Sequence, residues 1–282
     1  MELYPVRSRC PMIAWLLAVS LLAVGWPVGS FADDRAYPAS EFFTGPSLEM
    51  AEAIERNDMA ALRRGAEQGV DLHARGNHQI TLMWLAMLKQ NVDAVRTLVE
   101  LGVHPDAGPV EGGGARTPLG LALGSPDPRF LEAMLDGGLS PNEGTEDDNP
   151  LLFDAITMGT LDHVKLLVER GADLHFRTHN GTGYSPFAHS TTGTKPDIAI
   201  YLLEQGSEPN FRMNNGVTTA WIVHYKLNNL QPDDDRSQFI QLRDKMIERG
   251  VDFPPSPPVE VREQMRSEGL TPVVPTDFGY ER

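Results

Sequence analysis

The amino-acid sequence predicts an all-α solenoid of about six stacked helical repeats, and three observations support this prediction. A glycine recurs after a helical stretch, at spacings of 33, 36, 33, 35 and 44 residues. A second motif recurs in phase with it, and the segments between the two carry apolar residues at helical spacing. A unit this short cannot bury its apolar face alone, so neighbouring units must stack. The recurring glycines are Gly69, Gly102, Gly138, Gly171, Gly206 and Gly250.

The first element, residues 1–32, has the composition of a secretory signal peptide. Arg7 and Arg9 precede an apolar run over residues 13–24, and small residues precede a cleavage site after Ala32. The run is shorter than the roughly 20 residues that cross a bilayer, although an uncleaved anchor is the alternative. We therefore expect a periplasmic protein that has no membrane span after cleavage.

The repeats predict two helices each, a short one followed by a longer one. The short helix begins at the second motif, as in "TPLGLA" (117–122) and "SPFAHS" (185–190). The longer helix is exemplified by "LDHVKLLVE" (161–169) and ends at the recurring glycine. Glycine is expected there because a helix commonly stops at a left-handed residue, which only glycine adopts without strain.

These motifs resemble the ankyrin repeat, whose consensus runs T-P-L-H-x-A and then V-x-x-L-L-x-x-G-A-D. The resemblance covers residues 47–253 and implies an ankyrin-repeat solenoid with a finger loop between successive units. The chain departs from the consensus at the histidine, so the hydrogen bonds that this histidine makes in the family are expected to be absent. The residues that replace this histidine are Trp84, Gly120, Phe153, Ala188 and Trp221.

The two ends of the repeat array are expected to act as caps. Residues 33–46 are predicted to be extended, and Ser47 is a candidate N-cap of the first helix. Residues 254–282 form a proline-rich C-terminal tail, with a short polar helix expected at 259–268. The insertion at 227–238 is expected to lengthen the turn between the last two helices of the array.

Composition limits the classes of partner. The chain has a net charge of −15, which becomes −16 without residues 1–32, and its only cysteine is Cys10. Without a possible disulfide after cleavage, the domain must be held by its core and by stacking. The acidity excludes nucleic acid and anionic lipid as favoured partners and indicates a protein with a basic surface.

No catalytic residue, metal site or cofactor is predicted. His175 and His179 lie four residues apart, but His175 aligns with His73 after a glycine turn, where a polar residue serves the turn. Zinc needs three or four converging ligands, which this spacing does not supply. The acidic runs at 144–150 and 232–236 lack the ligand pattern of an EF-hand and are read as solvated turns.

The resemblance implies that the finger loops and the ends of the short helices contact a protein partner. Ile80 and Met158 have an alternative role in packing within the stack. The lengthened finger over residues 178–185 carries three of the candidates: His179 and Asn180, which it adds, and Tyr184, which the family pattern also supplies. The candidates are His78, Ile80, Leu88, Lys89, Arg116, Asp147, Asn149, Met158, His179, Asn180, Tyr184, Asn215 and Tyr225.

Export combined with this repeat resembles the periplasmic ankyrin proteins that act as immunity proteins against phospholipase effectors of type VI secretion. The segment "EFFTGPSLEMAEAIERND" (41–58) carries this resemblance. It implies a non-enzymatic protein that binds and neutralises a toxic lipase. The alternative is a periplasmic scaffold that supports a housekeeping enzyme such as catalase, and a hydrolase is a third possibility without a visible site.

Overall fold

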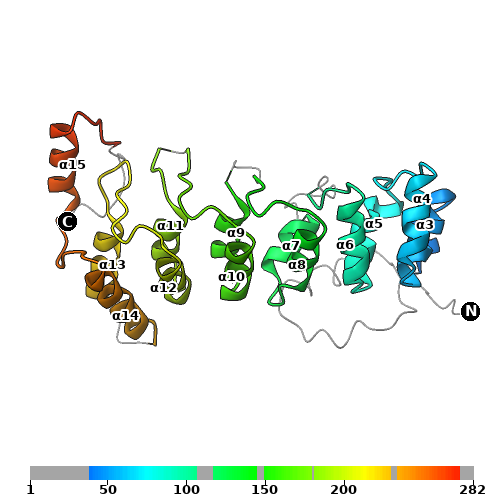
Figure 1. Cartoon of the computed structure of the whole chain (residues 1–282), viewed down its shortest axis with the longest axis horizontal. Helices are drawn as coiled ribbons and strands as arrows, with labels where there is room; N and C mark the ends of the chain where they lie inside the picture. Colours follow the sequence, from blue (N-terminus) through cyan, green and yellow to red (C-terminus); the bar gives the residue numbers. More distant parts are fainter. Residues whose placement is uncertain (1–37, 107–116, 145–148, 180, 230–233, 274–282) are drawn as a thin grey trace, which may run out of the picture. The chain divides into compact units, whose positions relative to one another are not determined.

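The computed structural model describes residues 38–106, 117–144, 149–179, 181–229 and 234–273. It forms two compact units, with the boundary between Leu139 and Ser140. Within the described residues each unit consists of three pairs of helices joined by loops, without a regular strand (Figure 1). The predicted signal peptide lies outside the described residues.

Unit 1 contains two layers of helices. Helices α3, α5 and α7 pack side by side in one layer, and α4, α6 and α8 form the other. Each helix of the first layer connects directly to one of the second. The elements are α2 (Ala39–Phe42), α3 (Pro46–Glu55), α4 (Met59–Glu67), η2 (Asn77–Gln79), α5 (Leu82–Leu88), α6 (Val92–Glu100), α7 (Pro118–Gly124) and α8 (Arg129–Asp136).

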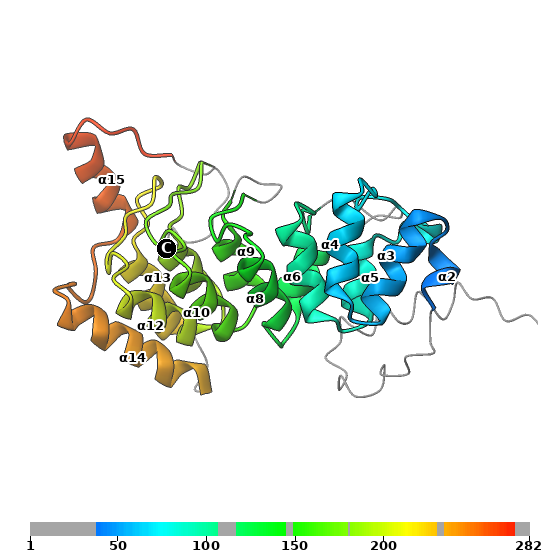
Figure 2. The ribbon, with the colours of Figure 1, turned by 45° about the vertical axis from the view of Figure 1, so that its right-hand side comes forward.

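Unit 2 repeats this arrangement and ends in an additional helix. The first helices of the repeats, α9, α11 and α13, form one layer, which we call the inner layer. The second helices, α10, α12 and α14, form the other, which we call the outer layer (Figure 2). Helix α15 lies at the level of the finger loops rather than in either layer (Figure 1). The elements are α9 (Leu151–Thr157), α10 (Leu161–Glu169), α11 (Pro186–Thr192), α12 (Pro196–Glu204), α13 (Thr219–Asn229), α14 (Asp234–Glu248) and α15 (Pro258–Ser267).

The predicted start and stop signals of the repeats are confirmed. All six recurring glycines have positive φ, between 82° and 108°. A Cβ atom at any of them would meet nothing within 4 Å, so backbone conformation rather than space requires glycine. At the other end of the repeat, the hydroxyls of Thr117 and Ser185 accept hydrogen bonds of 3.0 and 3.1 Å from backbone N–H groups of α7 and α11.

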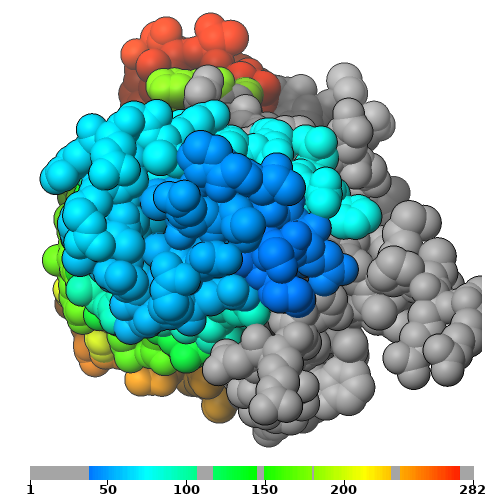
Figure 3. All heavy atoms as spheres, turned by 90° about the vertical axis from the view of Figure 1, so that its right-hand side faces the viewer, coloured from blue at the N-terminus to red at the C-terminus, as the bar shows by residue number. Residues whose placement is uncertain are grey.

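The N-terminal segment differs from its prediction. Residues 39–42, expected to be extended, form α2, and Phe42 and Phe43 are buried. These aromatic side chains cover the exposed end of the first repeat, which explains why the segment folds. Helix α3 begins at Pro46 with Gly45 as N-cap, so Ser47 lies inside the helix. Figure 3 looks onto this end of unit 1, where the blue atoms of the first helices form a continuous surface.

The last repeat also differs from its prediction. Residues 227–229 belong to α13 and residues 234–238 belong to α14, so much of the insertion extends these helices rather than their turn. Phe239, Leu242 and Met246 of α14 are buried, because the extended helix contributes its apolar face to the core of unit 2. The polar helix expected at 259–268 is confirmed as α15.

Candidate binding surface

The fingers of unit 2 are short hairpins that extend from the helix layers. In the fourth finger, residues 176–184, the Thr178 amide donates to the Tyr184 carbonyl at 2.9 Å. In the last finger, residues 210–218, the Met213 amide donates to the Val217 carbonyl at 2.9 Å. The two fingers are joined by a 3.0 Å hydrogen bond from the Asn214 amide to the Thr182 carbonyl. The fingers therefore form a connected layer beside the inner helices.

A row of aromatic and histidine rings lies where the fourth finger meets α9 and α11. The ring of Phe153 packs edge-on against Phe176, with centroids 5.9 Å apart, and lies 5.3 Å from His189. The row continues from Phe176 to His179 at 5.7 Å and from His189 to Tyr184 at 6.2 Å. We call these five residues the aromatic row. Rigid aromatic side chains of this kind are enriched at the centres of protein interfaces.

His189 is held in place by a neighbouring inner helix. Its Nε2 lies 2.9 Å from the hydroxyl of Thr157 on α9. Burial lowers the pKa of His189 below its usual value of 6.5, because the charged imidazolium would lose hydration. The side chain is therefore predominantly neutral at neutral pH, and it contributes an uncharged ring whose Nε2 is hydrogen-bonded to Thr157.

Met158, the C-cap residue of α9, is a further exposed apolar residue of unit 2. Its side chain is 49% exposed, which makes it one of five exposed large apolar residues among those described. Methionine adapts its shape to a partner because it is unbranched and polarisable. Exposure excludes the alternative that Met158 packs inside the stack, and it remains a candidate contact.

Two of the predicted contact residues make contacts within unit 1. Ile80 is 2% exposed, so it packs in the core and its candidacy as a partner contact is wrong. Lys89 is 10% exposed and its Nζ lies 2.9 Å from Glu55 Oε1. Its charge is therefore neutralised within the unit rather than presented to a partner.

The other candidates within the described residues are exposed or partly buried. His78 and His179 are exposed, and Leu88, Asn149, Tyr184, Asn215 and Tyr225 are partly buried. The Asn215 side chain accepts a hydrogen bond from the Val217 amide, so it serves the turn of the last finger. Arg116, Asp147 and Asn180 lie outside the described residues.

The sequence interpretation missed Phe176 and His189 as parts of a surface, and Phe153, which is 4% exposed, as the buried ring that both contact. Phe153 was visible as a replacement for the consensus histidine, and His189 lies on the next inner helix. Their proximity depends on stacking of α9 beside α11, which single-repeat patterns do not describe.

His175 is exposed, and its backbone amide donates to Asp173 Oδ1 at 2.8 Å. The same bond joins His73 to Asp71 at 2.9 Å, so Asp supplies the turn contact and His contributes its amide.

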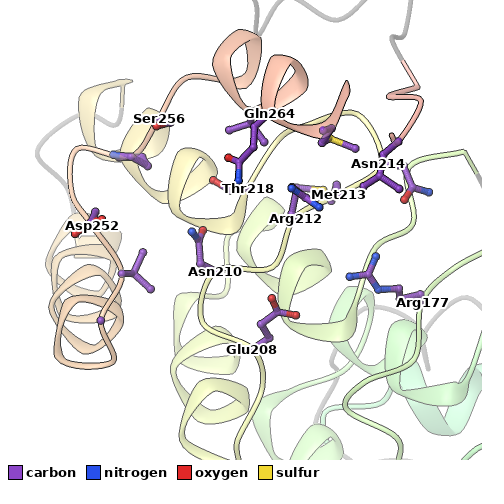
Figure 4. A pocket seen from close by; sticks show the side chains of 16 residues that line it. Arg177, Glu208, Asn210, Arg212, Met213, Asn214, Thr218, Asp252, Ser256 and Gln264 are labelled. Atoms are coloured by element: carbon purple, nitrogen blue, oxygen red, sulfur yellow. The ribbon is translucent and has the colours of Figure 1, made fainter. Parts of the chain in front are cut away.

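A polar groove of about 620 Å³ lies between the last finger and the segment that contains α15. Figure 4 shows the side chains of Glu208, Asn210 and Gln264 reaching into this space from different sides. Apolar side chains, including Val261 and Met265, complete the lining. This volume lies within the range of roughly 300–1,000 Å³ that is typical of binding sites.

No group of three or more His, Cys, Asp or Glu side chains in the described residues could hold a metal ion. None of the described helices is both long and apolar enough to cross a membrane.

Comparisons with known proteins identify the class. No family model matches the sequence. The ankyrin repeat domain of Bcl-3 has a TM-score of 0.53 at 23% identity, covering 72% of this chain and 86% of that chain. An ankyrin repeat domain from Acinetobacter baumannii has a TM-score of 0.51 at 17% identity, covering 72% and 98%. The fold is that of an ankyrin-repeat protein, and arrays of this type are protein-interaction modules.

Sequence relatives agree with this class. The B-cell lymphoma 3 protein homolog of Mus musculus is 31% identical over 175 residues, 58% of this chain and 38% of that protein. Protein PhlB of Serratia liquefaciens is 31% identical over 130 residues, 45% of this chain and 56% of that protein. The matches thus span between about two fifths and just over half of these relatives.

Proposed function

We propose that this protein is exported to the periplasm, where it binds a toxic secreted lipase or phospholipase and blocks its activity. The observation that carries the proposal is the group of exposed or partly exposed rings of the aromatic row, Phe176, His179, Tyr184 and His189, together with the exposed Met158, on a fold that binds proteins. A neutralising protein needs such a surface because desolvated aromatic side chains supply most of the affinity of an interface.

The charge of the chain supports a basic partner. A net charge of −15 would steer an approaching cationic protein toward the acidic chain and increase the association rate. Rapid association matters for an immunity protein because the toxin must be captured before it reaches its lipid substrate. The likeness to a bacterial protein, PhlB, is consistent with a bacterial setting.

The signal-like residues 1–32 support the proposed location. Their order of arginines, apolar run and small residues directs export of a chain. A lipase that attacks the membrane from the periplasmic side can be neutralised only by a protein in that compartment. Export and neutralisation are therefore parts of one proposal.

Co-expression with a candidate periplasmic phospholipase tests the proposal. We expect the full chain to preserve viability, a chain without residues 1–32 to fail, and purified chain to inhibit lipid hydrolysis. Protection by the truncated chain, or normal hydrolysis in the presence of bound chain, would contradict the proposal. Increased activity of a periplasmic catalase without any effect on the lipase would support the scaffold alternative instead.

A further inference from the structure

One wall of the groove is the last finger, and the other is α15 with the residues that follow it. Glu268, which follows α15, pairs with Arg212 of the finger at 2.9 Å. On α15, Arg262 donates to the Asn215 carbonyl at 3.3 Å, and Val261 and Met265 are buried. A Cβ atom at Gly216 would lie 2.6 Å from Arg262 Cγ, so only glycine permits this approach. These contacts fix α15 against the finger and keep the groove shaped without a ligand.

One edge of the last finger is only partly paired. Met213 bonds to Val217 and Phe211 bonds to Thr219 within the hairpin, so Arg212 and Asn214 direct their backbone groups to the opposite edge. There the Asn214 amide donates to Thr182, and the Asn214 carbonyl accepts a 2.9 Å bond from the Val273 amide. Among the described residues the N–H and C=O of Arg212 have no such partner. An extended peptide can pair with an edge of this kind.

Two carboxylates of the groove are available for a partner, whereas Arg212 is paired with Glu268. Glu208 and Asp252 are exposed, and neither forms an ion pair with any other residue in the described ranges. The guanidinium of Arg177 lies 4.2 Å from the centre of the Phe211 ring, where a cation–π contact orients it. The groove therefore offers both carboxylates and an oriented cation around an open backbone edge.

We propose that this groove binds an extended segment of a partner protein that pairs with the backbone of Arg212 and carries lysine or arginine side chains that reach Glu208 or Asp252. The pairing supplies affinity that does not depend on side chains, and the two carboxylates supply the preference for a basic segment. The inference rests on the proposed function in one respect, the binding of a basic protein, and adds the groove as a second contact surface for that protein besides the aromatic row.

Peptide selection tests the inference without a known partner. A displayed library of random peptides of about twelve residues, roughly 40 Å when extended, is selected on the full chain. We expect enrichment of Lys and Arg, and binding about tenfold weaker or worse to the double variant Glu208→Lys/Asp252→Lys. The matched control is Glu260→Lys/Glu263→Lys, which changes the same charge at exposed positions of α15 outside the groove. Failure to select basic peptides, or equal weakening in both variants, would overturn the proposal.

Amide hydrogen exchange tests the backbone contact. The selected peptide should slow exchange of the Arg212 amide, while the Met213 amide, already bonded to Val217, changes much less. Unchanged exchange at Arg212 in the bound state would exclude edge pairing. This inference can fail while the proposed function holds. If the variant Glu208→Lys/Asp252→Lys still protects cells from the lipase, the role of the groove in binding is refuted and neutralisation of the lipase is not.

Discussion

Lys195 closes the end of a helix in the preceding repeat, where its Nζ donates a 2.6 Å hydrogen bond to the Gly159 carbonyl. The same ammonium group donates to the carbonyl of Thr157 at 3.0 Å. The Thr157 carbonyl belongs to the last residue of α9 and the Gly159 carbonyl lies just beyond the helix, so neither has a partner within α9. In unit 1, the Asn91 side chain bonds to the Ile54 carbonyl in the same way, at 2.7 Å. In both units, a side chain at the start of the next repeat's second helix thus bonds to carbonyls at the end of the preceding repeat's first helix.

The variant Lys195→Met should destabilise the protein by about 1–2 kcal/mol, because charged hydrogen bonds to the α9 carbonyls are lost while the aliphatic stem is largely kept. Burial lowers the pKa of Lys195, and Asp197 opposes this effect. Urea unfolding measures the change. Lys165→Met is the control, because Lys165 is exposed and lies 3.7 Å from Asp162. Equal losses in both variants would show that the cap contributes nothing specific.

Stability should depend on pH through His189. Burial lowers the folded-state pKa, so the unfolded chain binds more protons between that value and 6.5. The free energy of unfolding should therefore fall as the pH decreases from about 7.5 to about 5.5, within the range in which histidine titrates. The variant His189→Gln removes the titrating group and should show a weaker dependence in urea titrations. The same pH profile in both proteins would assign the effect to other groups.

Removal of Lys89 should affect folding of unit 1 rather than binding. Lys89→Ala leaves Glu55 without its ion-pair partner, although the Ala39 amide still donates to Glu55 Oε1 at 3.0 Å. We expect a loss of about 1–3 kcal/mol, because a partly buried carboxylate loses its counter-charge. Hydrogen exchange should accelerate in α3 and α5 and stay unchanged in unit 2. Unchanged exchange in unit 1, together with weaker partner binding, would restore Lys89 as a contact residue.

Substitution of Met158 should weaken partner binding without loss of stability. Met158→Asp changes a side chain that is 49% exposed, so its effect on unfolding should stay within about 0.5 kcal/mol. Calorimetric titration with the neutralised lipase should show affinity lower by about tenfold or more, as expected for an interface anchor. Ile247→Asp is the matched control, since Ile247 is 46% exposed on the outer helix α14. Equal affinities for both variants would remove Met158 from the binding surface.

The sequence predicted the repeats well because their determinants are local. Gly171 stops α10 through its own backbone conformation, and Ser185 caps α11 through a bond to a residue three positions away. The ends were predicted less well. Phe42 and Phe43 fold onto the first repeat because of apolar surface that exists only after the helices pack. The burial of Ile80 and the ion pair of Lys89 were not predicted for the same reason, since both depend on neighbouring repeats.

The sequence by itself determined the helical repeat, the positions of its turns, the acidity of the chain and the absence of a recognisable catalytic motif. These properties follow from residue periodicity, backbone preference and charge, each readable within one unit of the chain. Tertiary structure decided which side chains meet: Phe153 beside His189, Lys195 at the end of α9, and α15 against the last finger. Such contacts join residues about 35 to 50 positions apart, and only the packing of successive repeats brings them within a few ångströms of one another.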